Sequence, residues 1–416
     1  MRNPQLGGTP ATTRSRNIGQ QPHTPALTGI RFPLALWVVA HHISGPGGML
    51  EPLIGTSVIA SGFIDAAWVA LSVFFAISGF VLARRYRTQH WTSAALRRYA
   101  AARFARVYPV YVLSLVILLP IIRDTLRQDG VSAASGAGLL LTHVLLLQGW
   151  YWPTVDWNTP AWSLSSEVFF YALAPLVVHV VRVPSWPRVA VAATLACALP
   201  LLVRQLVEPP VPKALLYLGD FLVGVAAAGF YERLQGRDRQ RAGPWLYGLA
   251  CAGGLILLLW RDSFGVFMVF DTGVRIVSAL LVTGLACGGG WLVRVLSSRV
   301  VLAGGQASYA IYILHIPVLW YYRRWGADTA GHPVAAGVVY VLMVVALALV
   351  VVRWYEAPAH ALLRRWWSGG PESPRGQTGS SGSVRVRGRD AGPKRSAVAS
   401  SRIDRLGCTQ PARSRG

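Results

Sequence analysis

The most constraining feature of this chain is the apolar stretch Leu27–Ile43, LTGIRFPLALWVVAHHI, which carries ionisable residues at both ends. Arg31 lies near its start, and His41 and His42 lie near its end. Ionisable groups are costly in hydrocarbon, so an Arg and His pair inside a membrane helix indicates function. Arg31 and His42 are about eleven residues apart, which leaves them about 20° apart on one helical face and about 16 Å apart along the axis. His41 points elsewhere. The alternative is that Arg31 snorkels to lipid headgroups and His42 hydrogen-bonds inside a bundle.

Composition places the chain among polytopic membrane proteins. It has 416 residues, of which 53% are hydrophobic and 14% charged, against about 25% charged in an average soluble domain. Apolar runs near the length of a bilayer crossing recur as far as Val352, so the lipid bilayer is an expected partner. The net charge of +23 comes from arginines in loops and in the tail, as the positive-inside rule expects. No nucleic-acid-binding module appears, and no cysteine or histidine spacing indicates a metal, so neither partner is predicted.

Eleven apolar segments are candidates to span the membrane. They are Leu27–Ile43, Ala67–Ala83, Val107–Ile122, Gly138–Trp150, Ala161–Val181, Val189–Val203, Ala214–Tyr231, Trp245–Trp260, Val274–Val295, Ser308–Tyr322 and Val334–Trp354. Gly138–Trp150 is the shortest and precedes the turn-like GWYWPTVDWNTP, so we expect it to enter the membrane and return. The predicted fold is all-α, a transmembrane bundle of about ten spanning helices plus this re-entrant segment.

Loop charges set the expected orientation. The arginine-rich stretch Arg84–Arg106 should be cytoplasmic. With a re-entrant fourth segment, the basic loop Arg233–Arg241 and both termini are cytoplasmic as well. The expected location of the protein is the plasma membrane. The alternative is eleven crossings with weak charge bias. The predicted domains are a polar N-terminal tail over 1–26, a membrane domain over 27–358, and a basic, largely disordered cytoplasmic tail over 359–416.

Two further patterns indicate ligand binding. Arg103 and Arg106 lie at i, i+3 at a helix start, where two guanidinium groups suit an anionic phosphate; the alternative is a purely topogenic role. In AWSLSSEVFFY, a polar stripe runs down one helical face beside the aromatic Trp162, and consists of Ser163, Glu167 and Tyr171. A carboxylate beside an aromatic ring suits a sugar; the alternative is an interfacial tryptophan and an acid near a helix start.

A second histidine lies on a polar stripe near the end of the chain. In ASYAIYILHIPVL, Ser308, Tyr312 and His315 fall at i, i+4 and i+7 of one helix. The last span closes with RWYEAP, where Glu356 is compatible with either a site or an interface role.

Together these stretches resemble the membrane acyltransferase family 3, the polytopic bacterial O-acyltransferases. LTGIRFPLALWVVAHH is similar to the family's Arg-x10-His helix, with Arg31 and His42 in the paired positions. FFAISGF, RFARVYP, WSLSSEVFFY, SYAIYILHIP and WYEAP are similar to five further family motifs in the same order. The resemblance covers Leu27 to Pro358. Thr28 departs from it, because many members have Asp there; threonine is similar to members that acylate glycosylated natural products such as macrolides.

The resemblance implies transfer of an acyl group from cytosolic acyl-CoA, with acetyl-CoA the expected donor, to a hydroxyl of a sugar-containing acceptor. That acceptor is a cell-surface glycan or a glycosylated natural product. No metal is implied. We expect Arg31, Arg103 and Arg106 to bind acyl-CoA. Trp162, Ser163, Tyr171 and Tyr312 would bind the acceptor.

For catalysis we expect His42 to be the general base, because a sugar hydroxyl attacks poorly unless a base takes its proton. Glu167 and His315 complete the expected catalytic set. His315 and Tyr312 are candidate oxyanion donors. A covalent acyl-Ser163 is a rival mechanism. The competing class of function is a non-catalytic transporter or export factor for a glycan or lipid-linked substrate, which would use the same charges as a relay.

Overall fold

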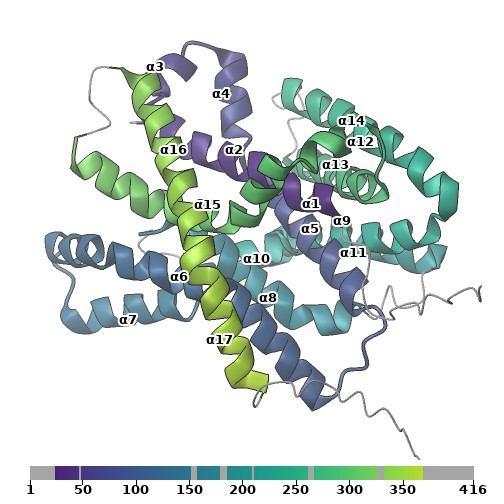
Figure 1. Cartoon of the computed structure of the whole chain (residues 1–416), viewed down its shortest axis with the longest axis horizontal. Helices are drawn as coiled ribbons and strands as arrows, with labels where there is room; N and C mark the ends of the chain where they lie inside the picture. Colours follow the sequence, from purple (N-terminus) through teal and green to yellow (C-terminus); the bar gives the residue numbers. More distant parts are fainter. Residues whose placement is uncertain are drawn as a thin grey trace, which may run out of the picture. The chain divides into compact units, whose positions relative to one another are not determined.

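The computed structural model describes residues 24–45, 48–150, 157–178, 185–208, 210–260, 267–326 and 332–368. Within these ranges every regular element is a helix and no strand occurs, which confirms the predicted all-α class (Figure 1). Both chain ends lie outside the described residues, and so does the predicted tail from residue 369 onward.

Nine of the described helical segments are long and apolar enough to cross a bilayer. In chain order they comprise α1 and α2 (Pro25–Gly29, Arg31–Ser44), α4 and α5 (Val58–Asp65, Trp68–Tyr86), α6 (Ser93–Gln128), α9 (Trp186–Leu206), α10 and α11 (Lys213–Leu216, Leu218–Arg233), α12 (Gly236–Leu259), α13 (Phe267–Cys287), α15 (Arg299–Arg324), and α16, η3 and α17 (Pro333–Val351, Val352–Glu356, Ala357–Ser368). The tenth predicted span is the shorter α8 (Trp162–Val177), which follows the 3-10 turn η1 (Thr159–Ala161). The remaining short helices are α3 (Glu51–Ile54), α7 (Ala133–Val144) and α14 (Gly290–Leu296).

The short helix α7 corresponds to the predicted re-entrant segment, although it begins earlier, at Ala133. Its 12 residues span about 18 Å, well short of a hydrocarbon core of about 30 Å. Tyr108 and Tyr111 of α6 donate hydrogen bonds to the backbone oxygens of Val144 and His143, at 2.5 and 2.7 Å. These bonds fix the end of α7 against α6.

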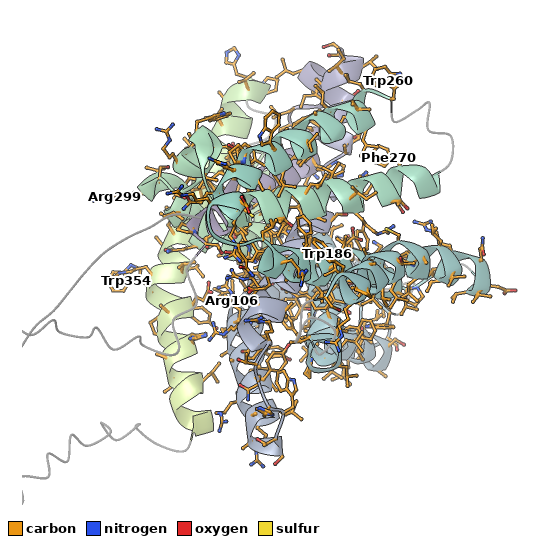
Figure 2. All side chains as sticks on the ribbon, turned by 90° about the vertical axis from the view of Figure 1, so that its right-hand side faces the viewer. Arg106, Trp186, Trp260, Phe270, Arg299 and Trp354 are labelled. Carbon is orange, nitrogen blue, oxygen red and sulfur yellow. The ribbon has the colours of Figure 1, made fainter. Side chains whose placement is uncertain are left out.

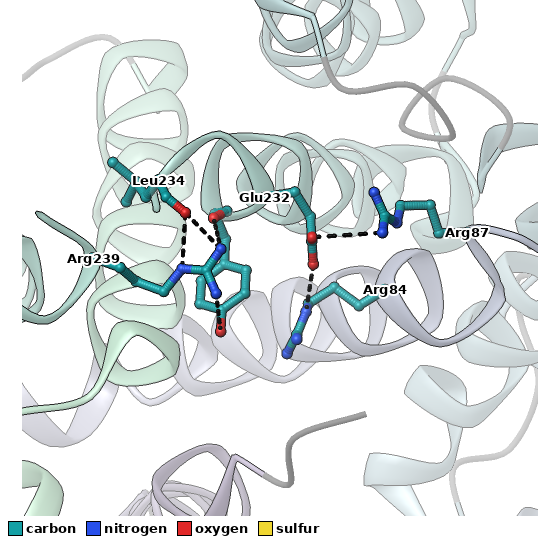
Figure 3. A network of polar contacts seen from close by, with 6 residues as sticks. Arg84, Arg87, Glu232, Leu234 and Arg239 are labelled. Atoms are coloured by element: carbon teal, nitrogen blue, oxygen red, sulfur yellow. Dashed lines mark hydrogen bonds and ion pairs between the residues drawn. The ribbon is translucent and has the colours of Figure 1, made fainter. Parts of the chain in front are cut away.

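An ion-pair network supports ten crossings rather than eleven (Figure 3). Arg84 near the end of α5 pairs with Glu232 near the end of α11, with 3.1 Å between Nε and Oε1, and Arg87 lies 3.8 Å from the same carboxylate. The ends of α5 and α11 therefore lie on one side of the bundle. Because α6, α8, α9 and α11 supply four crossings between those ends, α7 cannot supply a fifth.

We call this side the basic end, defined by Arg84, Arg85, Arg103 and Arg106. The opposite side, the histidine end, holds the last turn of α2 with His42 and the first turn of α11 with Asp220.

Two glycines, Gly79 and Gly224, allow α5 and α11 to pack closely. A Cβ at Gly79 would lie 2.1 Å from the backbone oxygen of Phe221, and one at Gly224 would lie 2.0 Å from that of Ala76. The two backbones are therefore in direct contact along this interface.

Two helix limits differ from the expected ones. The span Val274–Val295 is broken after Cys287, because Gly288, Gly289 and Gly290 take φ values of 83°, 83° and 77°, which end a helix. Beyond residue 358, α17 continues to Ser368 and packs along α6. The π-helical turn η3 joins α16 to α17, so the chain runs on as one helical rod (Figure 1).

Candidate active site

A cavity of about 310 Å³ lies at the basic end between α5, α6 and α17. Four arginines line it: Arg31, Arg85, Arg103 and Arg106. We call it the basic cavity. Three of these arginines are those expected to bind acyl-CoA, and the fourth, Arg85, belongs to the arginine-rich stretch Arg84–Arg106 that was expected only to be cytoplasmic. Four guanidinium groups around one space suit a ligand with several phosphate oxygens.

The arginines of α6 are held by neighbouring helices. Arg106 forms an ion pair with Glu356, whose position in the π-helical η3 turns its carboxylate into the bundle. In Figure 2 Arg106 lies beside this helix, while Trp354, 76% exposed, projects from its outer side. Arg103 lies 5.5 Å from the ring centre of Tyr171 and 5.9 Å from that of Tyr99, so aromatic faces fix its plane. Both arginines are therefore preorganised.

A second, narrower cavity of about 50 Å³ continues from the basic cavity toward the histidine end. We call it the central cavity. Arg31, Ser78 and Glu167 line both spaces, so the two meet at these side chains. The Nε of Arg31 is buried without a hydrogen-bond partner, and its guanidinium lies 5.9 Å from the ring centre of Phe74. A cationic donor group is thus available where the two cavities join.

Glu167 belongs to this junction. Its Oε1 accepts hydrogen bonds from Tyr171 at 2.5 Å and from Ser78 at 3.1 Å. In the described part of the chain it makes no hydrogen bond to His42 or His315. The predicted stripe on α8 therefore serves two regions: Glu167 and Tyr171 face the arginines of the basic cavity, and Ser163 faces the central cavity.

His42 and His315 meet across α2 and α15. Their ring centres are 4.9 Å apart, and His315 is fully buried. His42 Nδ1 lies 2.8 Å from the carbonyl oxygen of Val38, and His315 Nδ1 lies 2.7 Å from that of Tyr312. Carbonyls only accept, so each Nδ1 carries the proton. In the neutral imidazoles, both Nε2 atoms are then unprotonated. The lone pair of His315 Nε2 faces His42 Nδ1 at 3.4 Å.

His41 makes different contacts, as its rotation about the helix predicts. Its Nδ1 lies 3.1 Å from the carbonyl oxygen of Ile64 in α4. His41 therefore faces the α4 segment, and His42 faces the bundle interior.

Tyr312 connects the histidine pair to the central cavity. Its hydroxyl lies 2.8 Å from Ser163 Oγ, and Ser163 also donates to the carbonyl oxygen of Pro160 at 2.8 Å. Ser163 has no histidine hydrogen-bonded to it in the described residues, so nothing there activates it as a nucleophile. The N–H of His315 donates to the backbone oxygen of Tyr312. The Tyr312 hydroxyl donates to Ser163 or to the carbonyl oxygen of Pro160, at 2.8 and 3.2 Å, and it is the predicted oxyanion donor that lines the central cavity.

The residues predicted from sequence thus fall into connected groups, with three exceptions. His42 and His315 line neither the basic nor the central cavity, and Tyr312 connects this pair to the central cavity. Trp162 lines a separate space, described below. Sequence reasoning missed Arg85, Ser78 as a site residue, and His360. The signal for Arg85 was its i+7 spacing from Ser78, which places both on one face of α5.

A bundle of membrane helices with buried polar side chains around internal cavities defines a polytopic membrane protein with a ligand site inside the bundle. The chain belongs to the acyltransferase family 3 (Acyl_transf_3, acyltransferase domain), whose profile matches residues 24–353. It is a multi-pass membrane acyltransferase, so the transporter alternative is set aside.

Two relatives are similar to this chain. Acyltransferase MdmB of Streptomyces mycarofaciens is 30% identical over 338 residues, covering 74% of this chain and 84% of that protein. Protein 2 in picA locus of Rhizobium radiobacter is 31% identical over 163 residues, covering 35% of this chain and 78% of that protein. No solved structure matches the chain.

Proposed function

We propose that this protein is an O-acyltransferase of the plasma membrane that uses acyl-CoA, with acetyl-CoA the expected donor, and a sugar-containing acceptor. One observation carries the proposal: the basic cavity and the central cavity share Arg31, Ser78 and Glu167, and the central cavity ends at Tyr312 beside the histidine pair. A ligand with a phosphate-rich head and an extended arm fits such an arrangement.

The basic cavity would hold the phosphates of CoA. Charge-assisted hydrogen bonds from guanidinium groups to phosphate are strong and directional. The pantetheine arm would then pass Arg31 into the central cavity. Arg31 and His42 are about 16 Å apart along the helix, which is the length that the arm has to cover. The basic end is cytoplasmic in this scheme, where acyl-CoA is available.

His42 would act as the general base through Nε2. Its Nδ1–H is held by Val38 and faces the lone pair of His315, so the tautomer with a free Nε2 is the favoured one. His315 would be a positioning residue, which keeps that tautomer in place. This role resembles that of the third member in a nucleophile–base–orienter arrangement.

The reaction balances without a metal or a covalent enzyme intermediate. The acceptor hydroxyl oxygen attacks the thioester carbonyl carbon while His42 Nε2 takes the hydroxyl proton. The tetrahedral oxyanion then collapses, the carbon–sulfur bond breaks, and the CoA thiolate leaves and receives the proton from His42. The Tyr312 hydroxyl is the proposed donor to the oxyanion.

Membranes containing the full chain test the proposal directly. They are incubated with acyl-labelled acetyl-CoA and a panel of glycosides, and both the acylated glycoside and free CoA are measured. We expect the two products to form in equal amounts and to require the acceptor. Release of CoA without any acylated product over the whole panel, or no turnover at all, would contradict the proposed function.

A further inference from the structure

A third cavity opens near the histidine end, away from the donor arginines. It encloses about 410 Å³ and is bounded by α5, α8, α9, α10, α11 and α13. We call it the distal cavity. Its aromatic wall is formed by Trp68, Trp162 and Tyr217, with 5.2 Å between the ring centres of Trp162 and Tyr217. Flat aromatic faces bind the apolar faces of ring-shaped ligands.

Charged groups of both signs line the rest of the distal cavity. Arg275 lies 3.5 Å from Asp220 and 4.0 Å from Asp271, and Arg204 lies 3.2 Å from Asp271. Lys213 lies 4.4 Å from the ring centre of Trp162. Three cations and two carboxylates therefore share one aromatic space inside a membrane protein.

This cluster is not fully satisfied by its own members. Arg275 is only 4% exposed. Its Nε is ion-paired with Asp220 at 3.5 Å, whereas its Nη1 makes no hydrogen bond to any residue that the structure describes. A buried donor without an acceptor is costly, so this guanidinium can still take a partner with acceptor oxygens. Carboxylates beside it can accept hydrogen bonds from the same partner.

The distal cavity is separated from the central cavity by one layer of side chains. On α5, Leu71 lines the central cavity and Ser72 lines the distal cavity. On α8, Ser163 lines the central cavity and Trp162 lines the distal cavity. Tyr217 fills the wall between them, 5.5 Å from the ring centre of Phe75. A ligand in the distal cavity would therefore lie next to the space that leads to Tyr312.

We infer that the distal cavity is a carbohydrate-binding site that receives the sugar ring of the acceptor from the non-cytoplasmic side. The ring stacks on the Trp162 and Trp68 faces, and its hydroxyls pair with Arg275, Asp220 and Asp271. A hydroxyl group both donates and accepts hydrogen bonds, which matches a lining that holds guanidinium and carboxylate groups together. This inference rests on the proposed function for what the bound sugar is used for, but the binding itself does not require acyl-CoA.

The chain offers an internal probe for this test, because Lys213 and Lys394 are its two lysines and Lys394 lies in the C-terminal tail. Intact cells expressing the full chain are treated with a membrane-impermeant amine-reactive ester, and the Lys213 peptide is quantified by mass spectrometry. We expect labelling of Lys213 from outside. Methyl glycosides of hexoses, 6-deoxyhexoses and hexuronic acids are the probes, and at least one should slow this labelling by about fivefold or more, because the stacked ring covers the ammonium group.

Two controls make the result specific. A lysine introduced at the exposed Thr56, on the same side but outside the cavity, should be labelled at a rate that glycosides do not change. Glycerol at equal concentration should not protect Lys213. In Trp68→Phe, which keeps an aromatic residue but narrows the stacking face, protection by the same glycoside should require about tenfold more sugar.

Three results would overturn the inference: labelling of Lys213 only in permeabilised cells, equal labelling rates with every glycoside in the panel, or protection by glycerol as strong as by a glycoside. None of these bears on acyl-CoA turnover, which fails or succeeds in a separate assay. Protection without acyl transfer would leave the sugar site intact and would contradict only the proposed function.

Discussion

At the scale of single residues, the account depends on which of two adjacent histidines does the chemistry. His42 faces His315 and presents an unprotonated Nε2, whereas His41 faces the backbone of Ile64. General-base help is worth about 10²–10⁴ in rate. We therefore expect His42→Ala to lower turnover by about that factor, with normal protein levels and membrane insertion, while His41→Ala costs far less. Loss of activity in His41→Ala with retention in His42→Ala would show that the helical-face argument is wrong.

The donor arginines make a second residue-scale prediction. Arg103 is fixed between two tyrosine rings at the basic cavity, and lysine cannot reproduce a planar, two-pronged contact with phosphate. Arg103→Lys should raise the apparent KM for acyl-CoA about tenfold or more and that for the acceptor much less. Arg97→Lys, an exposed position on the same helix, is the matched control and should behave like the wild type. Equal effects of Arg103→Lys on both substrates would assign this arginine a structural role only.

Some features of the site could be predicted from the sequence, and others depend on tertiary packing. The shared face of Arg31 and His42 follows from helical geometry alone, because both lie on one helix. The contact between His42 and His315 could not be predicted, since it depends on how α2 packs against α15. The separation of Trp162 from Ser163 into different cavities has a local cause, because successive residues of a helix point about 100° apart. Which cavity each would meet depends on tertiary packing.

At the scale of helices, the interface between α5 and α11 should be the most sensitive to added side-chain atoms, because the two backbones are in direct contact there. A Cβ at Gly224 would lie 2.0 Å from a backbone oxygen, and a backbone cannot move aside as a flexible side chain can. Gly224→Ala should destabilise the fold by about 1–3 kcal/mol, seen as a lower thermal unfolding midpoint in detergent. Gly248→Ala on α12, where no atom lies within 4 Å of the added Cβ, is the matched control. An unchanged midpoint in Gly224→Ala would mean that the two helices pack less closely than described.

Helix existence was easier to predict than helix limits. Every one of the eleven apolar segments coincides at least in part with a helix. An apolar run in lipid has to pair its backbone N–H and C=O groups internally, and a helix does this. The break at Gly288–Gly290 was missed, since glycine is tolerated in membrane helices and the surrounding residues are apolar. The length of α6, 36 residues, was also missed, because its first turns carry arginines and lie beyond the apolar run.

At the scale of the whole molecule, orientation is the first quantity to test. The exposed Arg237 lies at the basic end, in the first turn of α12. In a variant without the native cysteines, Arg237→Cys should react with an impermeant maleimide only after the cells are permeabilised. Thr56→Cys, at the histidine end, should react in intact cells. The reverse pattern would place the donor arginines outside the cell and contradict the proposed topology.

The central claim is that donor and acceptor meet inside the bundle after entering from opposite ends. Sealed inside-out vesicles test it, with labelled acetyl-CoA added outside, at the cytoplasmic face, and an impermeant glycoside acceptor trapped inside. We predict acylated glycoside inside the vesicles and none in His42→Ala vesicles. With acetyl-CoA trapped inside and the glycoside outside, no product should form. Product in that reversed arrangement, or product only when both substrates are on one side, would contradict the account.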